Sequence, residues 1–290
     1  MFSRFRLDPS ALALTDDGQV PLIYWRVKPN FGDLLAPWLF QHLTGREVKL
    51  IKGLVNPVNL AAMVQYKWKQ KPIKIPHYIS IGSIMSRVKD NSIVWGTGSF
   101  GTEQFTQLST KARYCAVRGP LSRQLLRNVG VEVPQVYGDP ALLTPLFFDA
   151  PEEKTHKIGL VLRWSETEWL QATPGDGVTL IDLGSRDVEG TLHQILSCEM
   201  IITSSLHGLI IADTYGIPNA YLASDTPKGG EFKFYDYFAS VNKFRKPKAF
   251  DFTSEALTVD TLMNHFDFDG REIDFDAINL LRACPFLEEV

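Results

Sequence analysis

Short apolar runs alternate with amphipathic segments along the whole chain. An apolar run of about four to eight residues between turn residues is typical of a buried strand, whereas apolar residues three and four positions apart indicate one face of a helix. Their alternation predicts an α/β protein. The predicted strands are residues 21–27, 48–51, 78–82, 93–96, 114–117, 157–163, 179–183, 200–203 and 220–222. The predicted helices are residues 31–43, 119–130, 188–196, 258–266 and 273–282, with another that begins near Leu209.

One polar stretch interrupts this alternation. Residues 149–157, DAPEEKTHK, are charged and contain a proline, and the pattern of strands and helices restarts after them. Such stretches are typical of domain boundaries. We therefore expect two Rossmann-like domains that face a cleft, residues 1–150 and residues 151–290, the second ending in closing helices.

Composition narrows the class of protein. With 44% apolar and 22% charged residues, the chain matches ordinary soluble globular proteins, and its net charge of -3 predicts no nucleic-acid partner. Cys115, Cys198 and Cys284 lack the spacing of a zinc site or a disulfide framework, which favours a reducing compartment. No apolar stretch has the length of a membrane span, and the first residues do not resemble a signal peptide. We expect a cytoplasmic protein.

The segment 201–218, IITSSLHGLIIADTYGIP, carries the strongest functional signal. An apolar run stops at Ser204 and Ser205, and His207 and Gly208 then open a second apolar run with helical spacing. In α/β sheets, ligands bind where a strand ends and a helix begins, because free N–H groups and the positive helix end meet there. Because a histidine side chain can gain or lose a proton near neutral pH, His207 is a candidate acid or base. Alternatively, the serines only cap the helix and the histidine is a packed residue.

A glycine-rich segment follows the predicted strand 93–96. Gly96, Gly98 and Gly101 match the dinucleotide-binding pattern G-x-G-x-x-G, with Ser99 inside it. That interpretation fails because the ribose-binding acidic residue is missing: no Asp or Glu occurs between Gln104 and Val131. The glycines could still let a ligand approach the backbone, or they could form a plain turn.

Three cations are candidates for anion binding. Arg118 follows the strand 114–117, where its guanidinium would face the cleft and clamp a carboxylate or phosphate, unless it forms a surface ion pair. Arg163 ends a predicted strand and Lys233 lies in GGEFKFYDYF. Either could neutralise a phosphate or be a solvated surface charge.

Polar residues also follow two other strands. Asn30, Gly32 and Asp33 lie between the first strand and the first helix. Asn30 or Asp33 could cap that helix, or Asp33 could hydrogen-bond a ligand hydroxyl or remove its proton. Asp139, in Gly-Asp-Pro, fits a turn as well as a site.

Two basic segments, residues 66–74 and 243–248, could rest on anionic lipid headgroups or form a solvated face. The chain shows no His and Asp cluster at metal-ligand spacing, so we expect no metal.

Five segments, in this order, resemble the polysaccharide pyruvyltransferase family, in particular the members that add ketal-linked pyruvate to exopolysaccharides. They are NFGDLLAPWL, IVWGTGSF, AVRGPLSRQLL, VYGDPALLTPLFF and ITSSLHGLIIADTYGIPNAYL. The resemblance covers most of residues 25–240.

The resemblance implies a GT-B-like fold, with the acceptor on the N-terminal domain and the donor on the C-terminal domain. It implies transfer from phosphoenolpyruvate to two hydroxyls of one sugar, in a bacterial polysaccharide or its lipid-linked precursor, at the inner face of the cytoplasmic membrane and without a cofactor. Arg118 and His207 fall on catalytic or donor-binding positions of the family, and Asp33, Gly98 and Asp139 fall on its other motif positions.

Some relatives carry an arginine where this chain has Ser205, so Arg163 or Lys233 would supply the missing cation. The mechanism we expect places the donor carboxylate on Arg118 and its phosphate near the helix that Gly208 opens, with His207 as the acid. Two alternatives remain: a GT-B glycosyltransferase that uses a nucleotide sugar, and a non-catalytic polysaccharide-assembly subunit.

Overall fold

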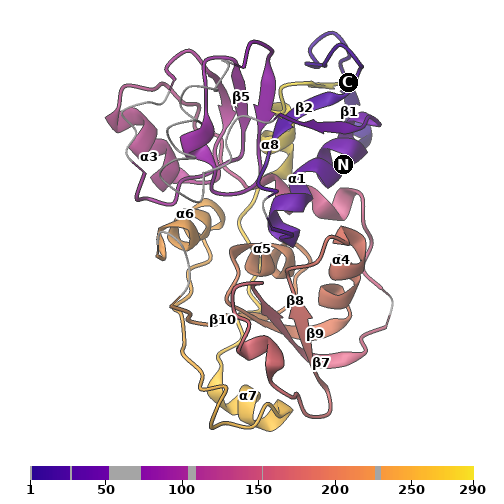
Figure 1. Ribbon diagram of the computed structural model, residues 1–290, viewed down its shortest axis with the longest axis vertical. Helices are drawn as coiled ribbons and strands as arrows, with labels where there is room; N and C mark the ends of the chain where they lie inside the picture. Colours follow the sequence, from indigo (N-terminus) through magenta and orange to yellow (C-terminus); the bar gives the residue numbers. More distant parts are fainter. Residues whose placement is uncertain (1, 27, 52–72, 104–108, 152, 226–229) are drawn as a thin grey trace, which may run out of the picture.

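The computed structural model describes residues 2–26, 28–51, 73–103, 109–151, 153–225 and 230–290. Two parallel sheets form its framework, and Figure 1 shows one above the other. The upper sheet contains, in spatial order, β3 (Val48–Leu50), β2 (Val20–Ile23), β4 (His77–Ile79), β5 (Ser92–Trp95) and β6 (Arg113–Ala116). The lower sheet contains β10 (Asn219–Tyr221), β9 (Cys198–Thr203), β7 (His156–Leu162) and β8 (Val178–Asp182).

Helices connect these strands. The α-helices are α1 (Phe31–Thr44), α3 (Pro120–Asn128), α4 (Val188–Leu196), α5 (Leu206–Thr214), α6 (Phe232–Val241), α7 (Val259–His265) and α8 (Ala277–Arg282). The 3-10 helices are η1 (Phe2–Arg4), η2 (Met85–Arg87), η4 (Pro140–Leu146) and η5 (Trp169–Gln171). The predicted α/β class is confirmed, and the predicted helix at residues 188–196 coincides with α4.

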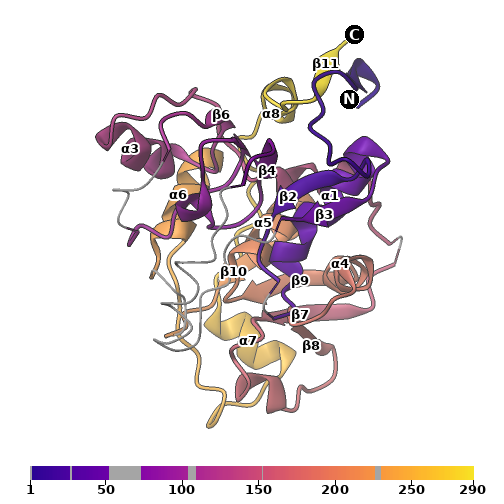
Figure 2. The ribbon, with the colours of Figure 1, turned by 45° about the horizontal axis from the view of Figure 1, so that its top comes forward.

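Among the described elements, the sequence pattern missed the four 3-10 helices, two short strands and one α-helix. Strands β1 (Phe5–Leu7) and β11 (Leu287–Glu289) pair antiparallel, so the last residues lie beside the first ones, as both views show (Figures 1 and 2). Each has three residues, too few for an alternating pattern. Helix α6 was missed because aromatic residues crowd its sequence. The predicted helix 273–282 begins only at Ala277, after its N-cap Asp276.

The two sheets share their largest hydrophobic cluster. Tyr78 and Trp95 of the upper sheet belong to it, and so do Ile181 and Ile201 of the lower sheet. Between the sheets, α1, α4, α5 and η4 pack against one another. The first N–H of α1, from Phe31, donates to the Leu183 carbonyl at 2.8 Å, just beyond β8. This contact holds the start of α1 at the lower sheet. The domain boundary at residue 150 and the GT-B-like arrangement stay predictions.

After β10 the chain returns to the upper sheet. Helix α6 packs against α3, and both ribbon views show the two helices side by side (Figures 1 and 2). Helix α7 then packs under the lower sheet through the buried Leu262, whereas α8 contacts η4 and β11. The chain thus passes repeatedly between the two sheets.

Candidate active site

Loops that follow strands of both sheets meet at the first turns of α1 and α5. Gly32 in α1 and His207 in α5 are in such close contact that a Cβ on Gly32 would lie 2.0 Å from His207 Nδ1. Only glycine therefore fits here while the imidazole keeps its position. The other side of the ring faces η4, where His207 Nε2 lies 3.7 Å from Asp139 Oδ2.

Asp139 and His207 are both enclosed. The Asp139 side chain has no exposed surface, and that of His207 is 12% exposed. Asp139 Oδ1 accepts the Ala141 N–H at 3.1 Å and so caps η4, which confirms the turn chemistry predicted for Gly-Asp-Pro. Its Oδ2 is left facing the histidine.

Asp33 lies one residue beyond Gly32. Asn30 precedes the helix but forms no side-chain cap; its amide instead donates to Asp33 Oδ2 at 2.6 Å, so the capping interpretation is wrong for both. The surrounding protein displaces water from the Asp33 carboxyl and raises its pKa from 3.8 to about 6, although the residue keeps some exposure. His207, Lys233 and Arg87 act against this rise, which places their charges near the carboxyl.

Lys233 enters the site from the first turn of α6. Burial and, after it, the neighbouring positive charges of Arg163 and Arg118 together lower its pKa from 10.5 to about 8. Asp33 acts in the opposite direction. This is an unusually cationic environment for a lysine, and an anion bound there would restore its charge.

Arg163 and Ser204, one of the two serines before His207, form one network through Glu166. Arg163 Nε donates to Glu166 Oε1 at 3.1 Å, and Ser204 Oγ donates to Glu166 Oε2 at 2.5 Å. Ser205 is the N-cap residue of α5 but makes no side-chain cap, so neither serine serves the capping role. The glycine at 208 lets α5 approach the Thr203 side chain, where a Cβ would lie 2.3 Å from Oγ1.

Arg118 is fully buried, so the expectation that it faces an open cleft is wrong. Its Nε donates to Asp236 Oδ2 at 2.9 Å, Nη1 to Ser83 Oγ at 2.7 Å and Nη2 to the Ser99 carbonyl at 2.7 Å. Asp236 also accepts the Ser122 N–H at 2.8 Å and thereby caps α3 from another helix. Arg118 thus joins α6, which carries Lys233, to the upper sheet.

The glycine motif is explained by packing. A Cβ on Gly98 would lie 2.3 Å from Arg118 Cζ, and Gly96, with φ at 90°, lies against Pro140 beside Asp139. Gly101 lies in the same way against Phe232 at the start of α6. The three glycines allow segments of the site to approach one another closely.

The structure thus joins the predicted site residues into one connected group; their roles stay predictions. Sequence reasoning missed Arg87, Glu166 and Asp236. Arg87 lies in η2 and acts electrostatically on Asp33, and Glu166 pairs with Arg163 three residues away. The spacing of Arg163 and Glu166 was a visible signal, whereas nothing local pointed to Arg87 or Asp236.

The basic segment 243–248 forms only part of the surface that its sequence suggested, through the exposed Lys246 and Lys248. Lys243 and Arg245 are buried and both bind Asp213, Lys243 Nζ at 2.9 Å and Arg245 Nη2 at 2.6 Å. These two charges therefore face neither solvent nor lipid. Of the other basic segment, residues 66–72 lie outside the described part of the chain.

Within the described ranges, no group of three or more His, Cys, Asp or Glu residues is arranged to hold a metal ion. The expectation of no metal and no cofactor stays a prediction. None of the helices described has both the length and the apolar character that crossing a membrane requires.

Two curated proteins are similar to large parts of the chain. The chain is 30% identical over 173 residues to an uncharacterized protein, L143, of Acanthamoeba polyphaga mimivirus, covering 57% of this chain and 60% of the relative. It is 26% identical over 241 residues to the succinoglycan biosynthesis protein ExoV of Rhizobium meliloti, covering 78% of this chain and 66% of that protein. The chain therefore spans somewhat less than two thirds of each relative.

A solved structure of a functionally uncharacterized Klebsiella pneumoniae protein, KP1_0663, aligns with a TM-score of 0.47 and 11% identity over 80% of this chain and 93% of that one. The family description "Polysaccharide pyruvyl transferase" matches residues 30–226, which contain Asp33, Arg118, Asp139 and His207. That match covers more than half of the chain, which therefore belongs to the polysaccharide pyruvyl transferase family.

Proposed function

We propose that this protein transfers a pyruvyl group from phosphoenolpyruvate to two hydroxyls of one sugar, in a bacterial polysaccharide or its lipid-linked precursor, and forms a cyclic ketal. The observation that carries the proposal is the convergence of Asp33, His207 and Lys233 from three different helices. Asp33 and His207 can donate or accept protons, whereas Lys233 is a cation whose charge is poorly compensated by nearby negative charges. The family to which the chain belongs supports the reaction class.

The donor is a small molecule with a carboxylate and a phosphate, so its site needs concentrated positive charge. The Arg163 charge lies close enough to lower the pKa of Lys233, and a bound anion would relieve that repulsion. The first turn of α5 adds backbone N–H groups and a positive helix end. We assign the donor phosphate and carboxylate to these groups.

The chemistry requires one proton to be added and two to be removed. Protonation of the donor's methylene carbon turns it into a methyl group and makes C2 electrophilic, and the first sugar hydroxyl adds to C2 and releases its proton. The second hydroxyl then forms the other C–O bond while the C2–O bond to phosphate breaks. Phosphate leaves, and the second hydroxyl proton is released. We assign the exchange of these protons to His207 and to Asp33, whose pKa is raised toward neutral pH.

Arg118 takes a positioning role in this proposal. Its guanidinium is enclosed and paired with Asp236, which lies one turn after Lys233 in α6. A rigid α6 would keep the Lys233 ammonium at the donor. Direct contact between Arg118 and the donor carboxylate, as the sequence suggested, stays a prediction.

The decisive experiment is mass spectrometry of candidate saccharides incubated with the protein and phosphoenolpyruvate, paired with a phosphate assay. We expect one pyruvyl ketal per modified sugar and one phosphate released for each ketal. Transfer of a glycosyl unit from a nucleotide sugar instead would establish the glycosyltransferase alternative. Donor-dependent protection against heat without turnover on any acceptor would favour a non-catalytic subunit.

Variants of His207 test its role directly. His207→Gln keeps a polar side chain of similar length but cannot serve as an acid near neutral pH, so we expect turnover to fall by about 10² to 10⁴-fold. Retention of more than about a tenth of the wild-type rate would remove His207 from the proton-transfer steps. His193→Gln, at a histidine in the last turn of α4, is the matched control and should leave the rate unchanged.

A further inference from the structure

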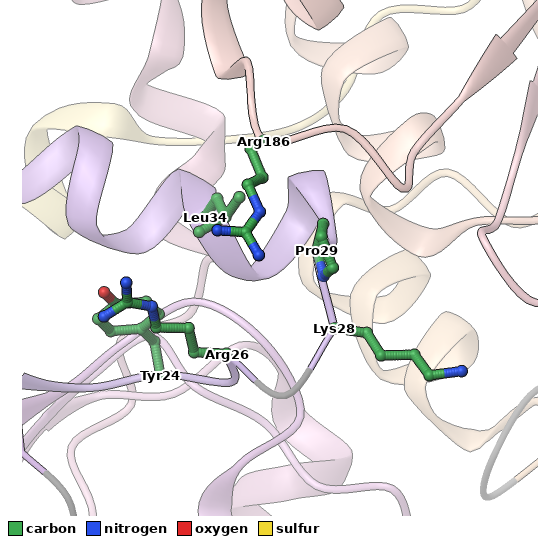
Figure 3. A pocket seen from close by; sticks show the side chains of 6 residues that line it. All are labelled: Tyr24, Arg26, Lys28, Pro29, Leu34 and Arg186. Atoms are coloured by element: carbon green, nitrogen blue, oxygen red, sulfur yellow. The ribbon is translucent and has the colours of Figure 1, made fainter.

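Beside the first turn of α1 lies a hollow of about 220 Å³ whose charged lining is entirely cationic. Tyr24, Arg26, Lys28 and Pro29 line it from the segment after β2, Leu34 from α1, and Arg186 from the loop between β8 and α4 (Figure 3). The hollow therefore takes residues from loops of both sheets. No carboxylate is among its lining residues.

Its two arginines differ from those exposed arginines that are paired with carboxylates. Arg4, Arg6, Arg271 and Arg282 each form an ion pair with a nearby carboxylate. Among the residues that the structure describes, Arg26 and Arg186 contact no carboxylate.

The side chains around the hollow have distinct orientations. In Figure 3, the Arg186 guanidinium extends past Leu34 toward Tyr24 and Arg26, and the Lys28 ammonium points away from them. Lys28 Nζ instead lies 4.4 Å from the centre of the Trp164 ring. The tyrosine ring is half-buried, and burial raises the pKa of its hydroxyl while the nearby Arg26 charge lowers it. Two guanidinium groups and a neutral phenol are thus the polar groups available to a ligand.

We propose that this hollow binds a phosphate group, carried as an ester by the saccharide acceptor. Two guanidinium groups present planar pairs of N–H donors that match phosphate oxygens, and a phosphate dianion would neutralise both. Leu34, which lines the hollow, is the residue after Asp33, so an acceptor held here by its phosphate would extend toward the proposed catalytic groups. The inference rests on the proposed function for the identity of the acceptor, but not for the binding of phosphate.

Binding is tested without turnover by calorimetry with inorganic pyrophosphate as the probe. We expect the double variant Arg26→Gln/Arg186→Gln to bind it at least tenfold more weakly than the wild type. Arg271→Gln removes an exposed arginine that is paired with Asp269 and should bind it as the wild type does. Because phosphate could also enter the donor site, the titration is repeated in Lys233→Met, where the tenfold loss caused by the double variant should persist. Equal binding by the double variant and the wild type would overturn the proposal.

A second measurement distinguishes free phosphate from an acceptor-borne one. The KM of a saccharide 1-phosphate is compared with that of the same saccharide without phosphate, in the wild type and the double variant. We expect the phosphate to lower KM at least tenfold in the wild type and to have no effect in the variant. Equal KM values for the two acceptors in the wild type would overturn the proposed binding of an acceptor-borne phosphate. Preference for a saccharide that bears only a carboxylate would also overturn it. If the double variant loses pyrophosphate binding but the wild type transfers no pyruvyl group, the phosphate site is retained and the proposed function is refuted.

Discussion

The Nε2 atom of His207 lies 3.7 Å from Oδ2 of Asp139, and neither atom has a hydrogen-bond partner within the described part of the chain. Asp139 is fixed through its other oxygen, which caps η4, so its free oxygen stays directed at the imidazole. A small shift of the ring would form an Nε2–H···Oδ2 bond. That bond would place the proton of the neutral ring on Nε2 and leave Nδ1 as the basic atom.

Asp139→Asn tests this arrangement. The amide oxygen can still cap η4, but the charge opposite His207 is lost. We expect turnover to fall about tenfold or more, by loss of histidine orientation, and ¹⁵N NMR of the neutral imidazole to show that the proton has left Nε2 in part of the population. Asp187→Asn, which caps α4 in the same way at an exposed site, should change neither quantity. An unaltered imidazole spectrum in Asp139→Asn would contradict the pairing.

Gly32→Ala tests the contact between α1 and His207. Alanine would ordinarily favour a helix by about 1 kcal/mol over glycine, yet its Cβ would overlap the imidazole. Because a side chain can rotate away more easily than a backbone can move, we expect stability to change little while turnover falls steeply.

The matched control for this substitution is Gly270→Ala, whose Cβ would meet only ordinary contacts with Pro218. Both variants are compared by thermal unfolding and by turnover. A Gly32→Ala protein with wild-type turnover would mean that His207 is not needed where the structure places it.

Asp33 makes stability depend on pH in a direction opposite to that of most carboxylates. Its folded pKa, about 6, exceeds the 3.8 of an ordinary aspartate, so the folded protein holds this proton more tightly than the unfolded chain does. The stabilisation that this tightly held proton gives the folded protein is fully present below pH 3.8 and is lost as pH rises through 6. Asp33→Asn should therefore gain stability relative to the wild type between these values, by at most about 3 kcal/mol.

Chemical denaturation at a series of pH values measures this difference. Asp251 is the control of opposite sign, because hydrogen bonds from Ser254 and Thr253 lower its pKa to about 2. Asp251→Asn should lose stability relative to the wild type as pH rises from about 2 to 3.8, and the difference should stay constant above that. A constant difference between Asp33→Asn and the wild type from pH 4 to pH 7 would show that the Asp33 pKa is not raised.

The strands and most helices followed from local pattern because the strands are short apolar runs and most helices bury an apolar face. The predicted site residues also proved to lie together, since they follow strands whose ends meet. Glycines mark these approaches: Gly32 and Gly98 stand where His207 and Arg118 leave no room for a side chain. The sequence alone could show that a special backbone position was needed, but not which side chain required it.

The partners of the site depended on contacts distant in sequence. Asp236 pairs with Arg118 across 118 positions, and no local pattern in α6 indicates an acid that caps α3. The burial of Lys243 and Arg245 was hidden for the same reason, because Asp213 lies 30 positions or more away. A cluster of charged residues is predicted to lie on the surface unless the carboxylate that neutralises it is known.

Lys233 gives the donor affinity a pH dependence. With a pKa of about 8, it loses its charge as pH rises through that value, and the attraction for an anionic donor weakens. We expect the KM for phosphoenolpyruvate to rise above pH 8 in the wild type. In Lys233→Arg the rise should be absent, because a guanidinium stays charged there.

Lys157→Arg alters an exposed lysine that pairs with Glu199 and should reproduce the wild-type profile. If Lys233→Arg also follows the wild-type profile, Lys233 does not bind the donor.

Asp236→Asn should be strongly destabilising. It would leave the Arg118 charge fully buried without its counter-ion, and breaking such a pair costs about 3–5 kcal/mol. Glu288→Gln, at an exposed pair with Arg6, should cost less than about 1 kcal/mol. Urea denaturation compares the two; equal losses would mean that the buried pair contributes no more than a surface one.

The repeated passage of the chain between the sheets limits how the protein can open. A two-lobed enzyme with a single connection can swing about one hinge, but here α6 is anchored on α3 while the segments before and after it belong to the lower sheet. Swinging the lobes apart would strain several covalent tethers at once and pull Asp236 from Arg118. We therefore expect opening motions to occur in loops and side chains, with the two sheets keeping their relative position.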